Sequence, residues 1–315
     1  MSLGTMRSSR GLASCWQLSA AAPRVNKYRK ASTIFMASPL ISTTELTARM
    51  NDAPNLVIVD TRHDLINPTM GRDAYAAGHI PGAIYLSIDE DLSSTKTGKN
   101  GRHPLPEAEE FAVTLGAKGI SNQSLVVVYD QGSAMFVGRL WWMLRWLGHD
   151  NVLVLDGGIA QWQKEGRAVE TTVNTRAAAT FKGSLRDHMR LTAAQTQASL
   201  TDPDRRVLDA RAAERYRGEV EPVDPVAGHI PGAFNRAFPN NLRDGLFKPA
   251  DELRREFAAI LAGRSPEQLI HQCGSGVSAL ANMIAMEHAG LNGSVLYAGS
   301  WSEWCSDDSR PVAKG

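Results

Sequence analysis

Short apolar runs alternate along the chain with longer apolar stretches of helical length. LVIVDTR at 56–62 and RVLDAR at 206–211 each contain a short run, rich in β-branched residues, that ends in Asp-x-Arg. Runs without polar alternation predict strands that are buried on both faces of a sheet. The longer stretches, such as FVGRLWWMLRWLG, predict helices that cover those faces. The pattern therefore predicts an α/β fold in which parallel sheets are flanked by helices.

The same pattern occurs twice. The hexapeptide GHIPGA stands at 78–83 and again, unchanged, at 228–233. Later in each half a strand, an apolar helix and a second strand recur, at 126–162 and at 268–304. Self-similarity at this scale indicates an internal repeat, so the chain is interpreted as a duplication of one α/β domain.

The duplication predicts the domain boundaries. We expect a first domain at 38–170, a linker at 171–186 that is rich in Thr and Ala, and a second domain at 187–315. Residues 1–37 form a basic leader without acidic residues, which we expect to be disordered. Its composition is typical of a mitochondrial transit peptide, so mitochondrial location is the alternative to the cytoplasmic location that we expect.

Composition narrows the function classes. The 315 residues carry a formal net charge of +1, which gives no strong field to attract nucleic acid or an anionic membrane. No apolar run reaches the roughly 18 residues that span a bilayer. Cys15, Cys273 and Cys305 include no close pair, which argues against a disulfide scaffold and a cysteine zinc site. We therefore expect free thiols in a reducing compartment, with no metal and no organic cofactor.

The two copies differ at one chemically important position. An offset of 142 aligns Gly148 with Gly290 and places Gln131 opposite Cys273. Cys273 follows the strand QLIHQ, and ligands of an open parallel sheet bind beyond the carboxyl ends of its strands. Only the second copy therefore carries a nucleophile at this edge.

The segment CGSGVS suits a reactive sulfur. Gly274 and Gly276 let the backbone curl with positive φ, so that N–H groups turn inward around the sulfur. The helix that begins near Ser278 adds partial positive charge, and together these features favour a thiolate or a persulfide anion. The hydroxyl of Ser275 is available to donate to a substrate or to relay a proton. An inert buried cysteine is the alternative interpretation of Cys273.

Asp-x-Arg, GHIPGA, the cysteine loop and GSWSEW together resemble the tandem-domain rhodanese superfamily over about residues 38–315. The loop CGSGVS is most similar to the CGSGVTA of 3-mercaptopyruvate sulfurtransferases, with Ser278 in place of the usual Thr. The resemblance implies two rhodanese-like domains, of which only the second is catalytic. It also implies sulfur transfer through a persulfide on Cys273.

Thiosulfate-preferring members carry basic residues directly after the cysteine, whereas this loop is neutral. A neutral loop of amides and hydroxyls suits mercaptopyruvate, which has one carboxylate and a keto group. The segment RYRGE matches the family's arginine segment and implies that Arg215 grips the carboxylate. The usual second arginine is absent from VEPVDPVA at 220–227. The implied substrate-binding residues are Arg215, Gly274, Gly276, Val277 and Ser278.

The resemblance further implies that the first domain brings an Asp and a His to the cleft. The matching positions are Asp73 and His79. Because His229 repeats the second of these in the other copy, a structural role for the histidine is the alternative. The Asp-x-Arg pairs also occur in both copies and are expected to be structural ion pairs: Asp60 with Arg62, and Asp209 with Arg211.

The implied mechanism is a double displacement. The Cys273 thiolate takes sulfur from mercaptopyruvate, pyruvate leaves, and the persulfide passes to a thiol such as thioredoxin or glutathione, or to cyanide. The alternatives are a thiosulfate sulfurtransferase with the same mechanism and a non-catalytic sulfur carrier or binding module. A cysteine phosphatase needs an arginine six positions after the cysteine, where this chain has Ala279.

Overall fold

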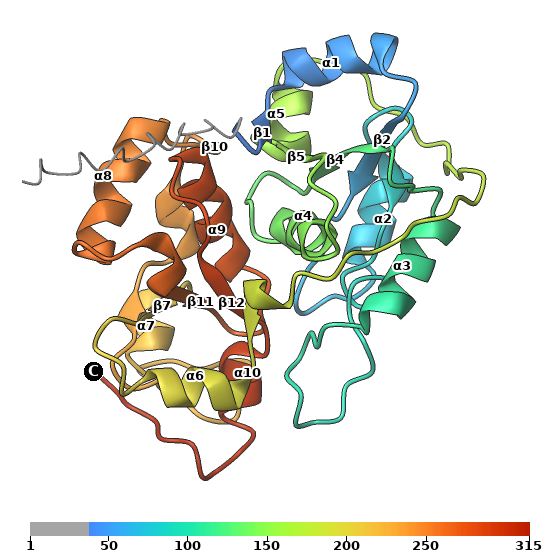
Figure 1. The fold of residues 1–315 in the computed structure, drawn as a ribbon. Coiled ribbons are helices and arrows are strands. Elements are labelled where there is room, and N and C mark those ends of the chain that lie inside the picture. Colours follow the sequence, from blue (N-terminus) through green and yellow to red (C-terminus); the bar gives the residue numbers. More distant parts are fainter. Residues whose placement is uncertain (1–37) are drawn as a thin grey trace, which may run out of the picture. The chain divides into compact units, whose positions relative to one another are not determined.

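The computed structural model describes residues 38–315, which contain two five-stranded parallel sheets (Figure 1). Residues 1–37, and with them Cys15 and the predicted leader, lie outside the described residues. The strand orders are β1-β5-β4-β2-β3 and β6-β12-β11-β7-β8, which follow the same path through equivalent strands. The predicted α/β fold with two copies of one parallel-sheet topology is therefore confirmed. No helix of the described part is long and apolar enough to cross a lipid bilayer.

The elements follow the predicted alternation of strands and helices. The first domain contains β1 (Leu40–Ile41), α1 (Thr43–Asp52), β2 (Leu56–Asp60), α2 (Met70–Ala77), β3 (Ile84–Tyr85), α3 (Ala108–Ala117), β4 (Leu125–Tyr129), α4 (Val137–Trp146), β5 (Val152–Leu155) and α5 (Gly158–Lys164). The second contains η1 (Asp187–Met189), β6 (Arg190–Leu191), α6 (Ala193–Ser199), β7 (Arg206–Asp209), α7 (Ala213–Tyr216), β8 (Phe234–Asn235), η2 (Phe238–Asn241), β9 (Leu242–Arg243), β10 (Leu246–Phe247), α8 (Ala250–Leu261), η3 (Pro266–Gln268), β11 (Leu269–Gln272), α9 (Ala279–His288), β12 (Val295–Tyr297) and α10 (Ser300–Trp304). Residues 171–186 form neither a helix nor a strand.

The apolar strands are buried on both faces. Val126 and Val128 of β4 pack into the cluster that contains side chains of α3 and α4. Val127 and Tyr129 of the same strand point the other way, into the cluster with α1 and α5. Successive side chains of a strand alternate between faces, so a strand with a core on each side needs an unbroken apolar run.

The two copies share one continuous core across α4 and α9. Leu140 of α4 and Leu280 of α9 belong to the same buried cluster. The helices meet at Gly138, where an added Cβ would lie 2.5 Å from the Cβ of Leu280. This contact brings the first domain against the helix that follows Cys273.

The Asp-x-Arg pairs are structural, as predicted. Arg62 contacts Asp60 at 2.7 Å and donates to the carbonyl of the first glycine of GHIPGA at 2.8 Å. Arg211 contacts Asp209 at 2.7 Å and donates to the corresponding glycine carbonyl at 2.7 Å. Each pair thus ties the end of a strand to its GHIPGA turn.

Candidate functional site: the Cys273 loop

Cys273 stands at the carboxyl end of β11, one residue before a turn that leads into α9. Cys273 is buried, with 1% of its surface exposed. The backbone N–H of Cys273 donates to Ser300 Oγ at 3.1 Å, and its carbonyl accepts from the N–H of Trp301 at 3.0 Å. The start of α10, which is the GSWSEW segment, therefore holds the cysteine in place.

The two loop glycines serve different purposes. Gly276 has φ +72°, and an added Cβ would lie 2.0 Å from the carbonyl oxygen of Ala298, so only glycine fits there. Gly274 does not have positive φ, contrary to the prediction. An added Cβ at Gly274 would lie 2.7 Å from Nη2 of Arg102 and 3.7 Å from Nη1 of Arg215, so this position faces the ends of two arginine side chains.

The counterpart of Cys273 in the first copy is Asp130, and the predicted pairing with Gln131 is wrong. In the sheets, Asp60 pairs with Tyr129 and Asp209 pairs with Gln272, so the next residues, Asp130 and Cys273, are equivalent. Their carbonyls accept equivalent bonds, from Ile159 and Trp301, both at 3.0 Å. The first loop is one residue longer, and an alignment without gaps cannot detect that insertion.

Asp130 fills its own loop with a carboxylate. Oδ1 accepts from the N–H of Gly132 at 2.7 Å, and Oδ2 accepts from Phe136 at 3.0 Å and Val137 at 3.4 Å. Burial raises the pKa of Asp130, and these backbone N–H groups act in the opposite direction. The first copy therefore places an internal acid where the second copy places sulfur.

Two arginines converge beside Gly274, one from each domain. Arg215 contacts Glu221 at 2.5 Å and Asp224 at 3.2 Å. Arg102, from the first domain, reaches the same Asp224 at 2.9 Å. The second guanidinium therefore comes from the first domain and not from residues 220–227, where the resemblance places it.

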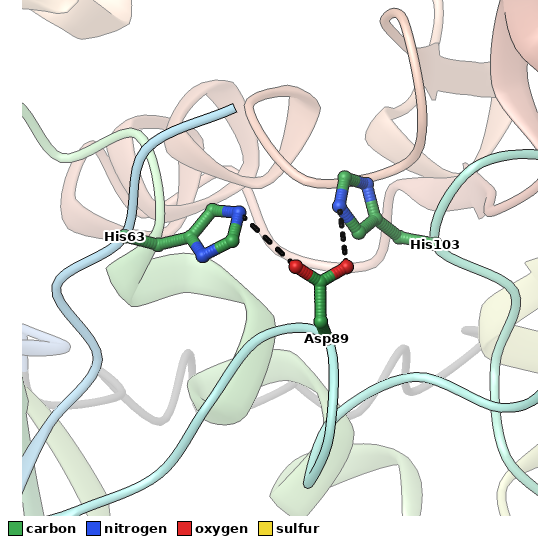
Figure 2. A group of neighbouring side chains, drawn as sticks. All are labelled: His63, Asp89 and His103. Atoms are coloured by element: carbon green, nitrogen blue, oxygen red, sulfur yellow. Dashed lines mark ion pairs between the residues drawn. The ribbon is translucent and has the colours of Figure 1, made fainter. Parts of the chain in front are cut away.

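Ser275, His103 and Asp89 form a connected set of polar side chains. His103 Nδ1 lies 2.8 Å from Ser275 Oγ, and His103 Nε2 lies 3.6 Å from Asp89 Oδ1. His63 approaches the other oxygen of Asp89 at 3.8 Å (Figure 2). Burial lowers the pKa of His103 to about 3, so the imidazole is neutral near pH 7. With its proton on Nε2, His103 accepts from the hydroxyl of Ser275, while Asp89 lies on the side of that proton at 3.6 Å, beyond direct hydrogen-bond distance. The order of the three side chains is that of a serine–histidine–carboxylate relay.

The same cluster is the candidate for a cation site in residues 38–315. His63, Asp89 and His103 offer ligand atoms that lie within 4.8 Å of one another (Figure 2). The ammonium of Lys96 lies 3.1 Å from Asp89 Oδ1 and already neutralises this carboxylate. The arrangement therefore favours a relay over a metal centre.

Asp73 and His79 are not brought to the Cys273 loop, and this assignment is corrected. Asp73 is exposed on α2 and accepts from Thr69 Oγ1 at 2.8 Å. His79 is fully buried, stacks on Tyr75 and contacts its carbonyl oxygen at 2.7 Å through Nδ1. His229 repeats this stacking on Tyr216, so the histidine of GHIPGA is a structural residue in both copies.

The remaining predicted residues have distinct places. Val277 is 1% exposed and belongs to the same buried cluster as Cys273. Ser278 is buried at the N-cap position of α9. Cys305 is also buried, and burial raises its pKa to about 11, which makes it a poor nucleophile.

The sequence interpretation missed Asp89, Arg102 and His103, although a signal existed. The segment between GHIPGA and the following helix is longer in the first copy than in the second, and it contains all three residues. Comparing the copies there, as was done for Cys273, would have identified this segment as a source of functional side chains.

Comparison with known proteins agrees with this geometry. A family model described as Rhodanese-like domain matches residues 42–165 and 192–307. A protein of Pseudomonas aeruginosa named "Probable 3-mercaptopyruvate sulfurtransferase" is 45% identical over 282 residues, which cover 89% of this chain and 99% of that protein. The thiosulfate sulfurtransferase of Cricetulus griseus is 35% identical over 257 residues, covering 80% of this chain and 85% of the relative.

Among solved structures, the crystal structure of SseA from Escherichia coli, described as a 3-mercaptopyruvate sulfotransferase, superposes with a TM-score of 0.73. It is 29% identical and covers 84% of this chain and 99% of its own. The chain belongs to the tandem-domain rhodanese superfamily, and its class of enzyme is sulfurtransferase.

Proposed function

We propose that this sulfurtransferase takes sulfur from 3-mercaptopyruvate and carries it as a persulfide on Cys273. The observation that carries the proposal is the pair of guanidinium groups, Arg102 and Arg215, that meet beside Gly274. A pair of this kind suits a substrate carboxylate, because each guanidinium presents two parallel N–H donors. The relative from Pseudomonas aeruginosa bears the name of this activity.

The charges around the arginines favour a monoanion. Arg102, Arg211 and Arg215 are balanced by three carboxylates, through the ion pairs that involve Asp209, Glu221 and Asp224. The cleft thus offers directed donors without surplus positive charge. Mercaptopyruvate carries one carboxylate and needs no surplus, whereas the thiosulfate dianion gains more from uncompensated cations.

The chemical step follows from these placements. The Cys273 thiolate attacks the sulfur of mercaptopyruvate, the carbon–sulfur bond breaks, and its electron pair enters the keto group to give the enolate of pyruvate. The proton lost by the substrate thiol is delivered to the methylene carbon through Ser275 and His103, which Asp89 orients. Pyruvate leaves, and the persulfide anion remains on Cys273.

The second step returns the enzyme to its thiolate. An acceptor thiol attacks the outer sulfur, the sulfur–sulfur bond breaks, and its electron pair returns to Cys273. Thioredoxin, glutathione or, in an assay, cyanide are the proposed acceptors. We propose a cytoplasmic location, with mitochondria as the alternative that follows from the basic leader.

The test is a comparison of donors on the same enzyme preparation. Pyruvate formation from mercaptopyruvate and thiocyanate formation from thiosulfate with cyanide give the two values of kcat/KM. We expect mercaptopyruvate to exceed thiosulfate by about a hundredfold, because a misfit of about 2.7 kcal/mol in the transition state has that effect. A higher kcat/KM for thiosulfate would overturn the donor assignment and support the alternative suggested by the Cricetulus griseus relative.

A single-turnover experiment separates an enzyme from a passive sulfur carrier or binding module. Without any acceptor, the enzyme should release a burst of about one pyruvate per chain, as expected for covalent catalysis. The absence of this burst would remove the persulfide mechanism.

A further inference from the structure

Arg139 is a buried arginine that links the first domain to the sulfur loop. It lies on α4, two residues into the helix, and is 0% exposed. Its guanidinium donates to the carbonyl of Gly276 at 3.2 Å, within the Cys273 loop. It also donates to the carbonyls of His103 at 2.8 Å and Leu92 at 3.0 Å. One side chain thus joins the loop that carries His103 to the loop that carries Cys273.

Arg139 lacks an acidic partner within residues 38–315. Every hydrogen bond of its guanidinium goes to a backbone carbonyl, and none of the ion pairs of the described chain includes it. Burial lowers the pKa of Arg139 to about 10, which still leaves it charged near neutral pH. Cys273 acts in the opposite direction and raises the pKa of Arg139, through the negative charge that its sulfur carries when ionised.

A cation of this kind is costly unless an anion compensates it. Backbone dipoles satisfy the donors, but the charge itself needs a counter-charge in a low-dielectric interior. Cys273 also contributes to raising the pKa of Arg211, but Arg211 already forms ion pairs with Asp209 and Glu221. Arg139 differs because no carboxylate of the described residues pairs with it, which leaves the sulfur of Cys273 as its counter-charge.

We propose that Arg139 is a positioning residue of sulfur transfer, which supplies the buried counter-charge for the sulfur anion of Cys273 and holds the His103 loop against the Cys273 loop. The inference rests on the proposed function, because that function requires a thiolate or persulfide anion on Cys273. It also gives the first domain, whose own loop holds Asp130 in place of a cysteine, a direct role in the chemistry of the second.

The approach of α4 makes this role possible. Gly138 precedes Arg139 and permits the contact with Leu280 at which any side chain would clash. The following residue is thereby placed at the start of α9, beside the sulfur loop.

The experiment compares Arg139→Met and Arg139→Lys with the matched control Arg145→Met. Arg145 lies on the same helix and reaches the second domain, but its partner is the carboxylate of Glu287. The first measurement is the rate at which iodoacetamide alkylates Cys273, followed by mass spectrometry of its peptide between pH 5 and 10. The second is the single-turnover burst of pyruvate, and the third is the thermal unfolding temperature.

We expect Arg139→Met to slow alkylation of Cys273 at pH 7 by about tenfold, because the reactive sulfur anion loses a buried positive charge that contacts its loop. It should unfold at a lower temperature, because the carbonyls of Leu92, His103 and Gly276 lose their donor inside the protein. Arg139→Lys should keep alkylation within about threefold, since the charge remains, but should slow the burst by about tenfold, since the fork that holds His103 is lost. Arg145→Met should change neither rate.

Alkylation of Arg139→Met at the wild-type rate across the pH range would overturn the proposal. If Arg139→Met does not fold, Arg139→Lys decides: a slowed burst with retained alkylation supports the proposal, and wild-type values for both overturn it. Failure of the proposed function has a different signature. The wild-type enzyme would then give no burst, while the dependence of alkylation on Arg139 would persist.

Discussion

The loops that follow β4 and β11 occupy equivalent places but begin with different side chains, the carboxyl group of Asp130 and the thiol of Cys273. In the first copy the carboxylate of Asp130 accepts N–H groups of its own loop, at 2.7 Å from Gly132 and 3.0 Å from Phe136. In the second copy the same position is Cys273. The backbone N–H groups of the first loop thus hold a carboxyl group at this place. The second loop has a sulfur atom there instead.

The two copies also differ in what each contributes to the loop of the other. The segment after GHIPGA crosses to the loop of the other domain in both cases. From the second domain it places Phe247, whose N–H donates to Asp156 at 2.9 Å near the first loop. From the first domain it places Arg102 and His103 beside Cys273. The first domain thus brings side chains to the loop of Cys273, whereas the second brings a backbone N–H to the region of the first loop.

The largest effect should come from removing the sulfur. Cys273→Ser replaces the buried nucleophile by a hydroxyl of similar size, so sulfur transfer from any donor should fall by more than about a thousandfold. The unfolding temperature should change little, because the volume is nearly conserved. Cys305→Ser is the matched control and should keep full activity. Retained transfer by Cys273→Ser, measured as pyruvate or thiocyanate, would refute the assignment.

Removing either guanidinium should have the next largest effect. Arg102→Met and Arg215→Met should each lower kcat/KM for mercaptopyruvate by about a hundredfold, since a charge-assisted bond to a carboxylate contributes about 2 to 3 kcal/mol. Steady-state kinetics should show the loss in KM as well as in kcat. Arg72→Met removes an exposed arginine of the first domain and serves as the control. An unchanged kcat/KM in Arg102→Met would mean that the first domain does not hold the substrate.

Asp130→Ala tests the loop of the first copy, in which a carboxyl group stands at the position of Cys273. Three backbone N–H groups lose their acceptor inside the protein, which should reduce the free energy of unfolding by about 3 kcal/mol. Urea denaturation checks this change, and the donor assay should give kcat/KM within about twofold of the wild type. A loss of activity without a loss of stability would contradict the view that this loop is only structural.

The smallest expected effect is a change in how stability depends on pH, and it concerns His271. It is fully buried without a partner for either ring nitrogen, and burial lowers its pKa to about 3. The unfolded chain takes up this proton first, below about pH 6.5, so stability is lost as the pH falls from there. The equivalent residue of the first copy is Val128, as the strand pairing shows. His271→Val should therefore remove about 2 kcal/mol of the stability difference between pH 7 and pH 5, measured by urea midpoints. The same pH dependence in both proteins would refute this explanation.

Local patterns predicted what depends on neighbouring residues. The apolar strands, the duplication, the Asp-x-Arg ion pairs and the glycine loop after Cys273 all follow from short stretches of sequence. These features are predictable because periodicity, β-branched residues and glycine act over a few positions. Arg215 was found in the same way, from the motif in which it stands.

Tertiary structure decided what depends on distant segments. A one-residue insertion moved the equivalence from Gln131 to Asp130, and only the pairing of strands reveals it. The histidine of GHIPGA repeats with its motif, yet its side chain is buried against a tyrosine in both copies. His103 and Ser275 lie 172 positions apart in the chain but 2.8 Å apart in the fold. Such contacts depend on how two domains pack and which segment crosses between them, and no local pattern of residues encodes that.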